Sequence, residues 1–138
     1  FSQLNKVEDF ILRRRENFSY LKEQLLDLDA ELLLPKETPG SQTSWFGFPV
    51  TLKKNASISR LSLVRFLDER RVGTRQLFAG NLTRQPYMMN TTYRISGSLE
   101  NTDNVMSNTF WIGVQPALTK QMLKFTADKI EQYLGIAF

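Results

Sequence analysis

An amphipathic stretch at the start of the chain constrains the fold more than any other feature. Its apolar residues recur at steps of three and four, which is the spacing of one buried helix face. They are Val7, Phe10, Ile11, Phe18, Leu21, Leu25 and Leu28. This stripe predicts a helix over residues 5–28. No capping residue precedes it, which indicates that the chain was cut from something longer.

Three further helices are predicted downstream. Ser59 caps the first of them, which buries Leu63, Phe66 and Leu67 and continues to about residue 71, with Gly73 as its stop. A short helix over residues 99–107 would bury Leu99, Val105 and Met106. Thr119 caps the last helix, and Gly135 is expected to end it. Its stripe is Met122, Leu123, Ala127, Ile130 and Leu134.

Three short runs rich in aromatic and β-branched residues predict strands, at residues 45–52, 74–79 and 109–114. Pro49 has no N–H to donate to a ladder, so it favours an edge or a bulge in the first run. Short strands separated by helices predict an α+β fold with a small antiparallel sheet covered by helices. The first and last helices are the expected covers, and 138 residues fit one domain.

The composition excludes several kinds of chemistry. Cys and His are both absent, which removes thiol and imidazole catalysis, disulfides, and the usual zinc or iron–sulfur ligands from this chain. This also suits a cytoplasmic protein. The net charge of +4 is spread over clusters that carry their own acidic neighbours, so nucleic-acid binding is not expected. No apolar run is long enough to span a membrane.

A polar loop over residues 74–86 is the candidate functional segment. Arg75, Asn81, Thr83 and Arg84 lie close together in it, around Phe78, which we expect in the core. Guanidinium groups suit phosphate, and amides and hydroxyls suit sugar hydroxyls, so the loop predicts a site for a phosphorylated or hydroxylated ligand. The alternative is an ordinary loop in which Arg84 forms a surface ion pair and Asn81 simply tolerates the turn after Gly80.

The pieces, taken in order, resemble the C-terminal small domain of the DegT-type sugar aminotransferases and dehydrases, which share the fold of type I pyridoxal-phosphate enzymes. QLNKVEDFILRRRENFSYL, at residues 3–21, is similar to the family's linking helix. NLTRQPY, at residues 81–87, aligns with a segment that commonly reads Pro-Leu-His-x-Gln-Pro-Tyr. FWIGVQPAL, at residues 110–118, resembles the run before the last helix.

Departures from the family pattern point to one branch of it. Asn81 stands in place of the usual Pro and Thr83 in place of the common His, and LENTDNV replaces Leu-Pro-x-Ala-Glu at residues 99–105. These features look like the CDP-4-keto-6-deoxyhexose 3-dehydrase, which removes the 3-hydroxyl in making 3,6-dideoxyhexoses for lipopolysaccharide O-antigen. Residues 1–138 would then be the small domain of that enzyme, and residues 1–28 its linking helix.

The resemblance implies that pyridoxal or pyridoxamine phosphate is held mainly by a missing large domain. No catalytic residue, metal ligand or cofactor is therefore expected in this fragment, which should be inactive alone. The implied partners are a nucleotide sugar, the large domain of the same chain, a second subunit and a reductase. An iron–sulfur cluster, where one takes part, would have its ligands upstream. Arg75 and Arg84 would meet diphosphate or sugar oxygens, while Asn81 and Thr83 face the hexose.

Two alternatives remain open. Within the family, the chain would belong to a sugar aminotransferase that carries Lys where the dehydrase branch carries His. Outside it, the chain would be a stand-alone binding domain of similar architecture. A severed small domain should expose an apolar patch, above all on the first helix, whereas an independent module should bury its apolar stripes fully.

Overall fold

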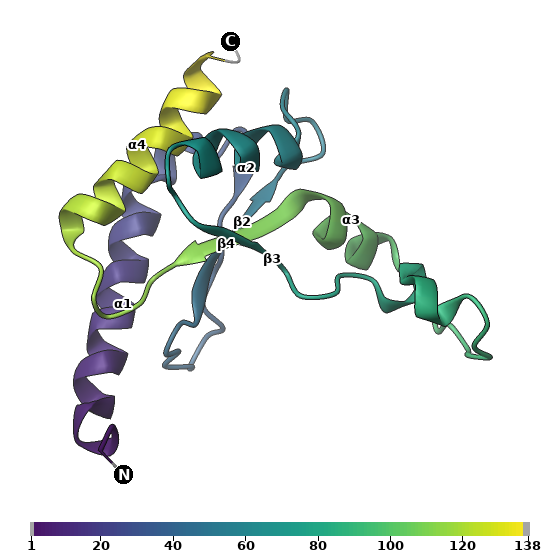
Figure 1. Ribbon diagram of the computed structural model, residues 1–138, viewed down its shortest axis with the longest axis horizontal. Coiled ribbons are helices and arrows are strands. Elements are labelled where there is room, and N and C mark those ends of the chain that lie inside the picture. The colour runs from purple at the N-terminus through teal and green to yellow at the C-terminus, as the bar shows by residue number, and fades with distance from the viewer. Residues whose placement is uncertain (1, 137–138) are drawn as a thin grey trace.

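A four-stranded antiparallel sheet forms the centre of the chain in the computed structural model, which describes residues 2–136 (Figure 1). The strands are β1 (Leu32–Leu33), β2 (Gly47–Leu52), β3 (Thr74–Gln76) and β4 (Thr109–Gly113), in the spatial order β1-β2-β4-β3. The expected α+β class with a small antiparallel sheet is confirmed. The sheet has one strand more than predicted, because the two residues of β1 are too few to show an alternating pattern.

β2 and β4 form the longest ladder, and their register places the apolar residues of both strands on one face. Phe48 lies opposite Ile112 and Val50 opposite Phe110. On its other side β2 pairs with β1 only at Thr51 and Leu52. That edge of β2 is therefore unpaired at Pro49, which is how the strand accommodates a residue without an N–H.

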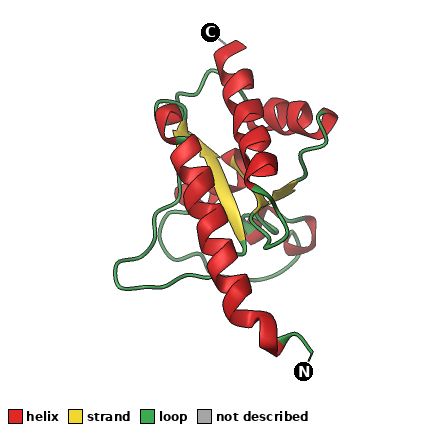
Figure 2. Cartoon of the chain, turned by 90° about the vertical axis from the view of Figure 1, so that its left-hand side faces the viewer, coloured by secondary structure: helices red, strands yellow, loops and turns green. Residues whose placement is uncertain are grey.

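Three helices cover this apolar face: α1 (Val7–Gln24), α2 (Arg60–Glu69) and α4 (Lys120–Ile136). α1 and α4 lie side by side over the strands (Figure 2). Their apolar stripes and the strands share one core, whose largest fully buried side chains include Leu21, Leu25, Phe48, Leu63, Phe110, Leu123, Ile130 and Leu134. The expected covers are confirmed, with α2 as a third.

The first half of α1 extends beyond the sheet. Of the predicted stripe, Phe18, Leu21 and Leu25 are buried, whereas Val7 is exposed. Leu4 and Leu12 are exposed as well. In Figure 2 this part of the helix continues toward the N-terminus with no other element beside it. The apolar stripe therefore runs past the core that the described residues form.

The expected stops of two helices are wrong. Arg71, not Gly73, takes the left-handed position after α2, with φ 60°. There its N–H donates to Asp68 O at 2.8 Å, and the N–H of Val72 donates to Leu67 O at 2.9 Å, which is a Schellman arrangement. This turn directs Val72 into the core, which explains why the helix ends at this point. Gly135 does not end α4, which continues to Ile136.

Residues 77–108 form an arm that projects from the body of the domain (Figure 1). It contains two 3-10 turns, η3 (Leu82–Arg84) and η4 (Pro86–Met88), and α3 (Glu100–Asn108), which leads directly into β4. The predicted helix over residues 99–107 is thus confirmed. Its expected apolar residues are only half-buried, since α3 has no fully buried residue.

Candidate functional site

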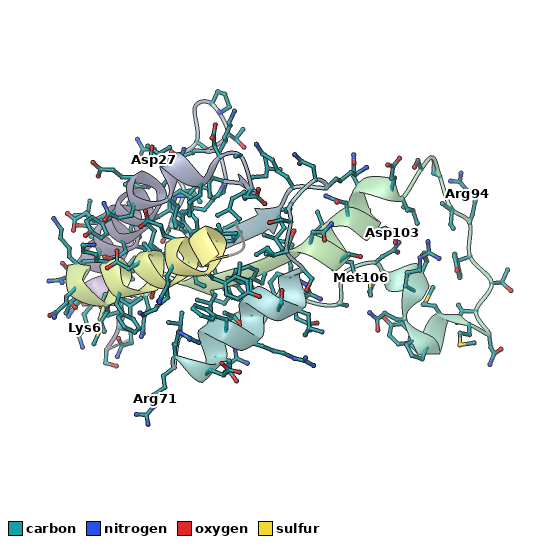
Figure 3. The ribbon with its side chains drawn as sticks, turned by 90° about the horizontal axis from the view of Figure 1, so that it is seen from above. Lys6, Asp27, Arg71, Arg94, Asp103 and Met106 are labelled. Atoms are coloured by element: carbon teal, nitrogen blue, oxygen red, sulfur yellow. The ribbon has the colours of Figure 1, made fainter. Side chains whose placement is uncertain are left out.

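Three of the four predicted site residues gather on the arm, around a carboxylate that the sequence did not single out. Asp103 on α3 faces the 3-10 segment that carries Asn81, Thr83 and Arg84 (Figure 3). Asn81 Nδ2 donates to Asp103 Oδ1 at 2.6 Å. Arg84 Nε and Nη2 donate to Oδ1 and Oδ2 of the same residue at 3.2 and 2.8 Å. Asp103 thereby joins α3 to η3.

Asn81 is the centre of this cluster and is only 2% exposed. Its Oδ1 accepts hydrogen bonds from the N–H of Thr83 at 3.0 Å and from Thr83 Oγ1 at 2.8 Å. The N–H of Asn81 itself donates to the sulfur of Met106 at 3.4 Å. With Asp103 on Nδ2, both ends of the amide are satisfied within the protein, which burial of a polar group requires.

Gly80 explains why the loop can approach α3 so closely. Its φ is +64°, and a Cβ there would lie 2.5 Å from Met106 Cγ. Only glycine accepts both the left-handed backbone and the contact. Gln85 closes the loop from the other side, because its Nε2 donates to the carbonyl of Ala79 at 2.6 Å. The expectation that Asn81 follows a tight turn is confirmed, but its side chain does more than tolerate that turn.

The bidentate ion pair between Arg84 and Asp103 shifts the pKa values of both residues. The hydrogen bond from Arg84, followed by that from Asn81, lowers the pKa of Asp103. The same pair raises the pKa of Arg84. A depressed carboxyl pKa means that the folded arm favours the ionised form more than the unfolded chain does.

The cluster is therefore expected to loosen in acid. The pKa of Asp103 is lowered from 3.8, its value in the unfolded chain. The ionised carboxylate therefore contributes its full stabilisation of the arm above that value, and this stabilisation is lost as the pH falls through the lower pKa of the folded state. Amide hydrogen exchange over residues 77–108, measured between about pH 5 and pH 2 and compared with the intrinsic exchange rate at each pH, should show lower protection factors at the acid end. Asp103→Asn should remove this pH dependence. An arm with equal protection across the range would contradict the assignment.

Arg75 lies apart from the cluster, on edge strand β3, directly opposite Trp111. It is exposed, and its guanidinium has no hydrogen-bond or ion-pair partner within residues 2–136. With Trp111 it borders an open groove of about 1070 Å³ between the end of α2, β3 and the first turns of α4. Arg71, Met122 and Phe125 line the same groove. Its volume is close to the upper end of the range of ligand pockets.

The sequence did not predict the group of three aromatic side chains that lies next to Arg75. Trp111 points away from the face that the helices cover, and its indole N–H donates to Gln76 O at 3.0 Å. Its ring centroid lies 4.6 Å from that of Phe46 and 6.1 Å from that of Phe78. Gly47 makes room for it, since a Cβ there would lie 1.9 Å from Trp111 Cε3. We call Phe46, Phe78 and Trp111 the aromatic face.

Phe78 corrects a prediction. It was expected in the core but is 79% exposed, with φ 50°. A bulky side chain in the left-handed region is uncommon, because its Cβ crowds the backbone. The signal that could have shown this is the Ala-Gly pair after it, which indicates a tight turn rather than a continuing strand.

The lysines show whether this chain could itself attach pyridoxal phosphate. Such a lysine is desolvated, which lowers its pKa. None of the lysines in the described range is fully buried. Lys54 pairs with Glu100, and the hydrogen bond to Asp128 raises the pKa of Lys124, the reverse of what a Schiff-base lysine needs. The residues present do not fit covalent attachment of the cofactor. No group of three possible metal ligands occurs within residues 2–136 either.

Two known proteins resemble this chain over nearly its whole length. The chain is 50% identical over 137 residues to the lipopolysaccharide biosynthesis protein RfbH of Salmonella typhimurium, covering 99% of this chain and 31% of that protein. It is 44% identical over 134 residues to a dTDP-4-dehydro-2,6-dideoxy-D-glucose 3-dehydratase of Saccharopolyspora spinosa, covering 97% of this chain and 29% of that protein. The chain thus spans about a third of the length of these relatives.

Solved structures share the fold of this chain. A crystal structure of GDP-4-keto-6-deoxymannose-3-dehydratase with a trapped PLP–glutamate geminal diamine superposes with a TM-score of 0.84 at 25% identity. It covers 94% of this chain, and the match takes up 33% of that one. No described helix is long and apolar enough to cross a membrane. Residues 1–131 match the family model, and the chain belongs to the DegT/DnrJ/EryC1/StrS aminotransferase family.

Proposed function

We propose that this chain is the C-terminal small domain of a nucleotide-sugar 3-dehydrase that depends on pyridoxal or pyridoxamine phosphate. The substrate would be a CDP-linked 4-keto-6-deoxyhexose, and the product would enter 3,6-dideoxyhexose and O-antigen synthesis. One observation carries the proposal: identity of 44–50% over nearly the whole chain to a sugar 3-dehydratase and to a lipopolysaccharide biosynthesis protein. The lack of cysteine in this chain suits a cytoplasmic enzyme.

Most of the catalytic chemistry would lie outside this chain. When bound, the cofactor ring supplies an electron sink, which lets the 3-hydroxyl leave the sugar. The large domain would hold that ring and the catalytic base. A second subunit and a reductase would complete the assembly. What the described residues can supply is a wall of the substrate cleft.

Two exposed apolar surfaces support docking onto such a large domain. One is the aromatic face, where Phe46 and Phe78 are exposed, and the other is the start of the chain, with Leu4 just before α1 and Val7 and Leu12 in its first half. A stand-alone module would bury these side chains, whereas a domain separated from its neighbour leaves them open. The patch was expected on the first helix, where Val7 of the α1 stripe is exposed and Phe10 and Ile11 are half-buried. The linking role proposed for residues 1–28 agrees with this position.

Three of the four site residues would contact the ligand, whereas Asn81, which was expected to face the hexose, is buried and would position one of them. Arg75 has an exposed guanidinium with no partner among residues 2–136, so it suits the diphosphate. Arg84 holds Asp103 through Nε and Nη2, and its Nη1, which has no partner in the part of the chain that the structure describes, suits a sugar or phosphate oxygen. Thr83 would meet the hexose. Asn81, buried and satisfied by its neighbours, would act by holding Thr83 in place.

The activity is tested with the full-length enzyme, CDP-4-keto-6-deoxyglucose and pyridoxamine phosphate, by following loss of the 3-hydroxyl. Arg75→Ala should raise KM about tenfold or more, because a charged hydrogen bond is worth about 1.5–3 kcal/mol. Arg65→Ala is the matched control, since Arg65 is an exposed arginine of α2 outside the groove. Equal kinetics for the two variants would reject Arg75 as a substrate contact.

A second candidate is a sugar aminotransferase, since the matched family is named for that activity. It would transfer an amino group from glutamate to the 4-keto carbon and leave the 3-hydroxyl in place. The two products differ in mass, so one assay distinguishes them. The residue at the cofactor carbon, Lys or His, distinguishes them from the full-length sequence alone.

A further inference from the structure

The side-chain hydrogen bonds around Asn81 form a chain with one direction. Thr83 donates to Asn81, and Asn81 donates to Asp103. Asp103, when ionised, accepts only, so the side-chain group of Asn81 that faces it at 2.6 Å is the NH₂. The carbonyl Oδ1 of Asn81 therefore faces Thr83. The backbone N–H of Thr83 fixes the same orientation independently, because it donates to that oxygen at 3.0 Å.

This orientation decides what the hydroxyl of Thr83 can do. Oγ1 lies 2.8 Å from Asn81 Oδ1, and an amide oxygen has no proton to give. The hydroxyl proton of Thr83 is consequently committed to Asn81. A free threonine hydroxyl both donates and accepts, but this one keeps only lone pairs for any other partner.

We propose that Thr83 is a specificity residue that acts only as a hydrogen-bond acceptor, so that the sugar group it meets is a hydroxyl donor and not a carbonyl or ether oxygen. This assignment rests on the proposed function, in which Thr83 faces the hexose. Asp103 is the positioning residue that sets the direction through Asn81. Thr83 is half-buried, which leaves its oxygen room for one further partner.

Reversing the direction is unfavourable for a physical reason. Flipping the amide of Asn81 would place its oxygen against the carboxylate of Asp103 and its NH₂ against the N–H of Thr83. Both contacts would leave like groups facing each other around the buried Asn81. Arg84 holds the carboxylate through two bonds and so keeps Asp103 in its place. The acceptor character of Thr83 is thus built into the arm.

The test uses dissociation constants of unreactive ligands with the full-length enzyme. The probes are CDP-6-deoxyglucose and its analogues in which each sugar hydroxyl in turn is replaced by hydrogen or by fluorine. Fluorine accepts weakly but cannot donate. At the position that meets Thr83, both replacements should weaken binding equally, by about threefold to tenfold. At that position a fluoro analogue that binds like the parent would show that Thr83 donates, and would overturn the proposal.

Variants of Thr83 supply the control. Thr83→Val keeps the shape but removes the hydroxyl, and should bind the parent as weakly as wild type binds the critical deoxy analogue. In that variant, replacing the critical sugar hydroxyl should no longer weaken binding. Thr83→Ser should restore the weakening. If the Thr83→Val enzyme binds every probe with wild-type affinity, only the role assigned to Thr83 is overturned. If the wild-type enzyme binds no CDP-sugar, the proposed function is overturned as well.

Discussion

Replacing Phe48 by alanine is expected to lower the free energy of unfolding by about 3–5 kcal/mol, because the change removes a buried aromatic ring from the centre of the sheet. Phe48 is 0% exposed, lies opposite Ile112 in the longest ladder and contacts the ring of Phe18 at 4.8 Å between centroids. The surrounding helices are held by the strands and can collapse only partly into the space. A loss of this size is a large share of the stability of a domain.

Phe46 offers a matched control for that change, two residues earlier. It is 68% exposed and contacts only the outer face of Trp111 among the ring pairs of the described residues. Phe46→Ala should change stability by no more than about 1 kcal/mol. Urea unfolding of both variants, with the slope compared to that of the parent, measures the difference. Equal losses for the two would mean that the core is not centred on Phe48.

Adding a single methyl group at Gly47 is expected to destabilise the protein by about 1–3 kcal/mol, even though alanine is the smallest possible change. The new Cβ would lie 1.9 Å from Cε3 and 2.5 Å from Cζ3 of Trp111. The indole cannot simply move aside, because its N–H is bonded to Gln76 O and its ring lies against Phe46. Gly47→Ala should therefore also disturb the pairing of β3 with β4.

Gly73→Ala is the control for Gly47→Ala. A Cβ at Gly73 would meet no atom within 4 Å, and its backbone is outside the left-handed region. That variant should be neutral or slightly stabilised, since alanine restricts the unfolded chain. Thermal unfolding and the chemical shift of the Trp111 indole proton report on both variants. An unshifted indole signal in Gly47→Ala would show that Trp111 does not lie over Gly47.

The arm shows where reasoning from sequence came close and where it stopped. The loop over residues 74–86 was identified by its concentration of arginine, amide and hydroxyl groups, and three of its four candidates do meet in space. Asp103 was missed, since it lies 19 residues beyond Arg84 in a helix with no sign of a role. An ion pair between distant segments depends on how they fold together, and no local pattern records it.

Trp111 is a second case. The strand that contains it was predicted, and alternation along β4 implies that it faces away from Phe110 and Ile112. Nothing in the sequence indicated that Phe46, Phe78 and Arg75 would border it. Those neighbours depend on the register of β2 and β3 against β4, which is a property of the whole sheet.

The helix stripes, three of the four strands and the family followed from the amino-acid sequence, because periodicity, caps and motifs are local and each is written within a few consecutive residues. Only the folded chain revealed that the stripe of α1 extends past the core, that Asn81 is turned inward, and that Arg75 stands apart from Arg84. Burial and hydrogen-bond direction depend on what each side chain meets across the fold. They emerge when segments far apart in the chain pack together.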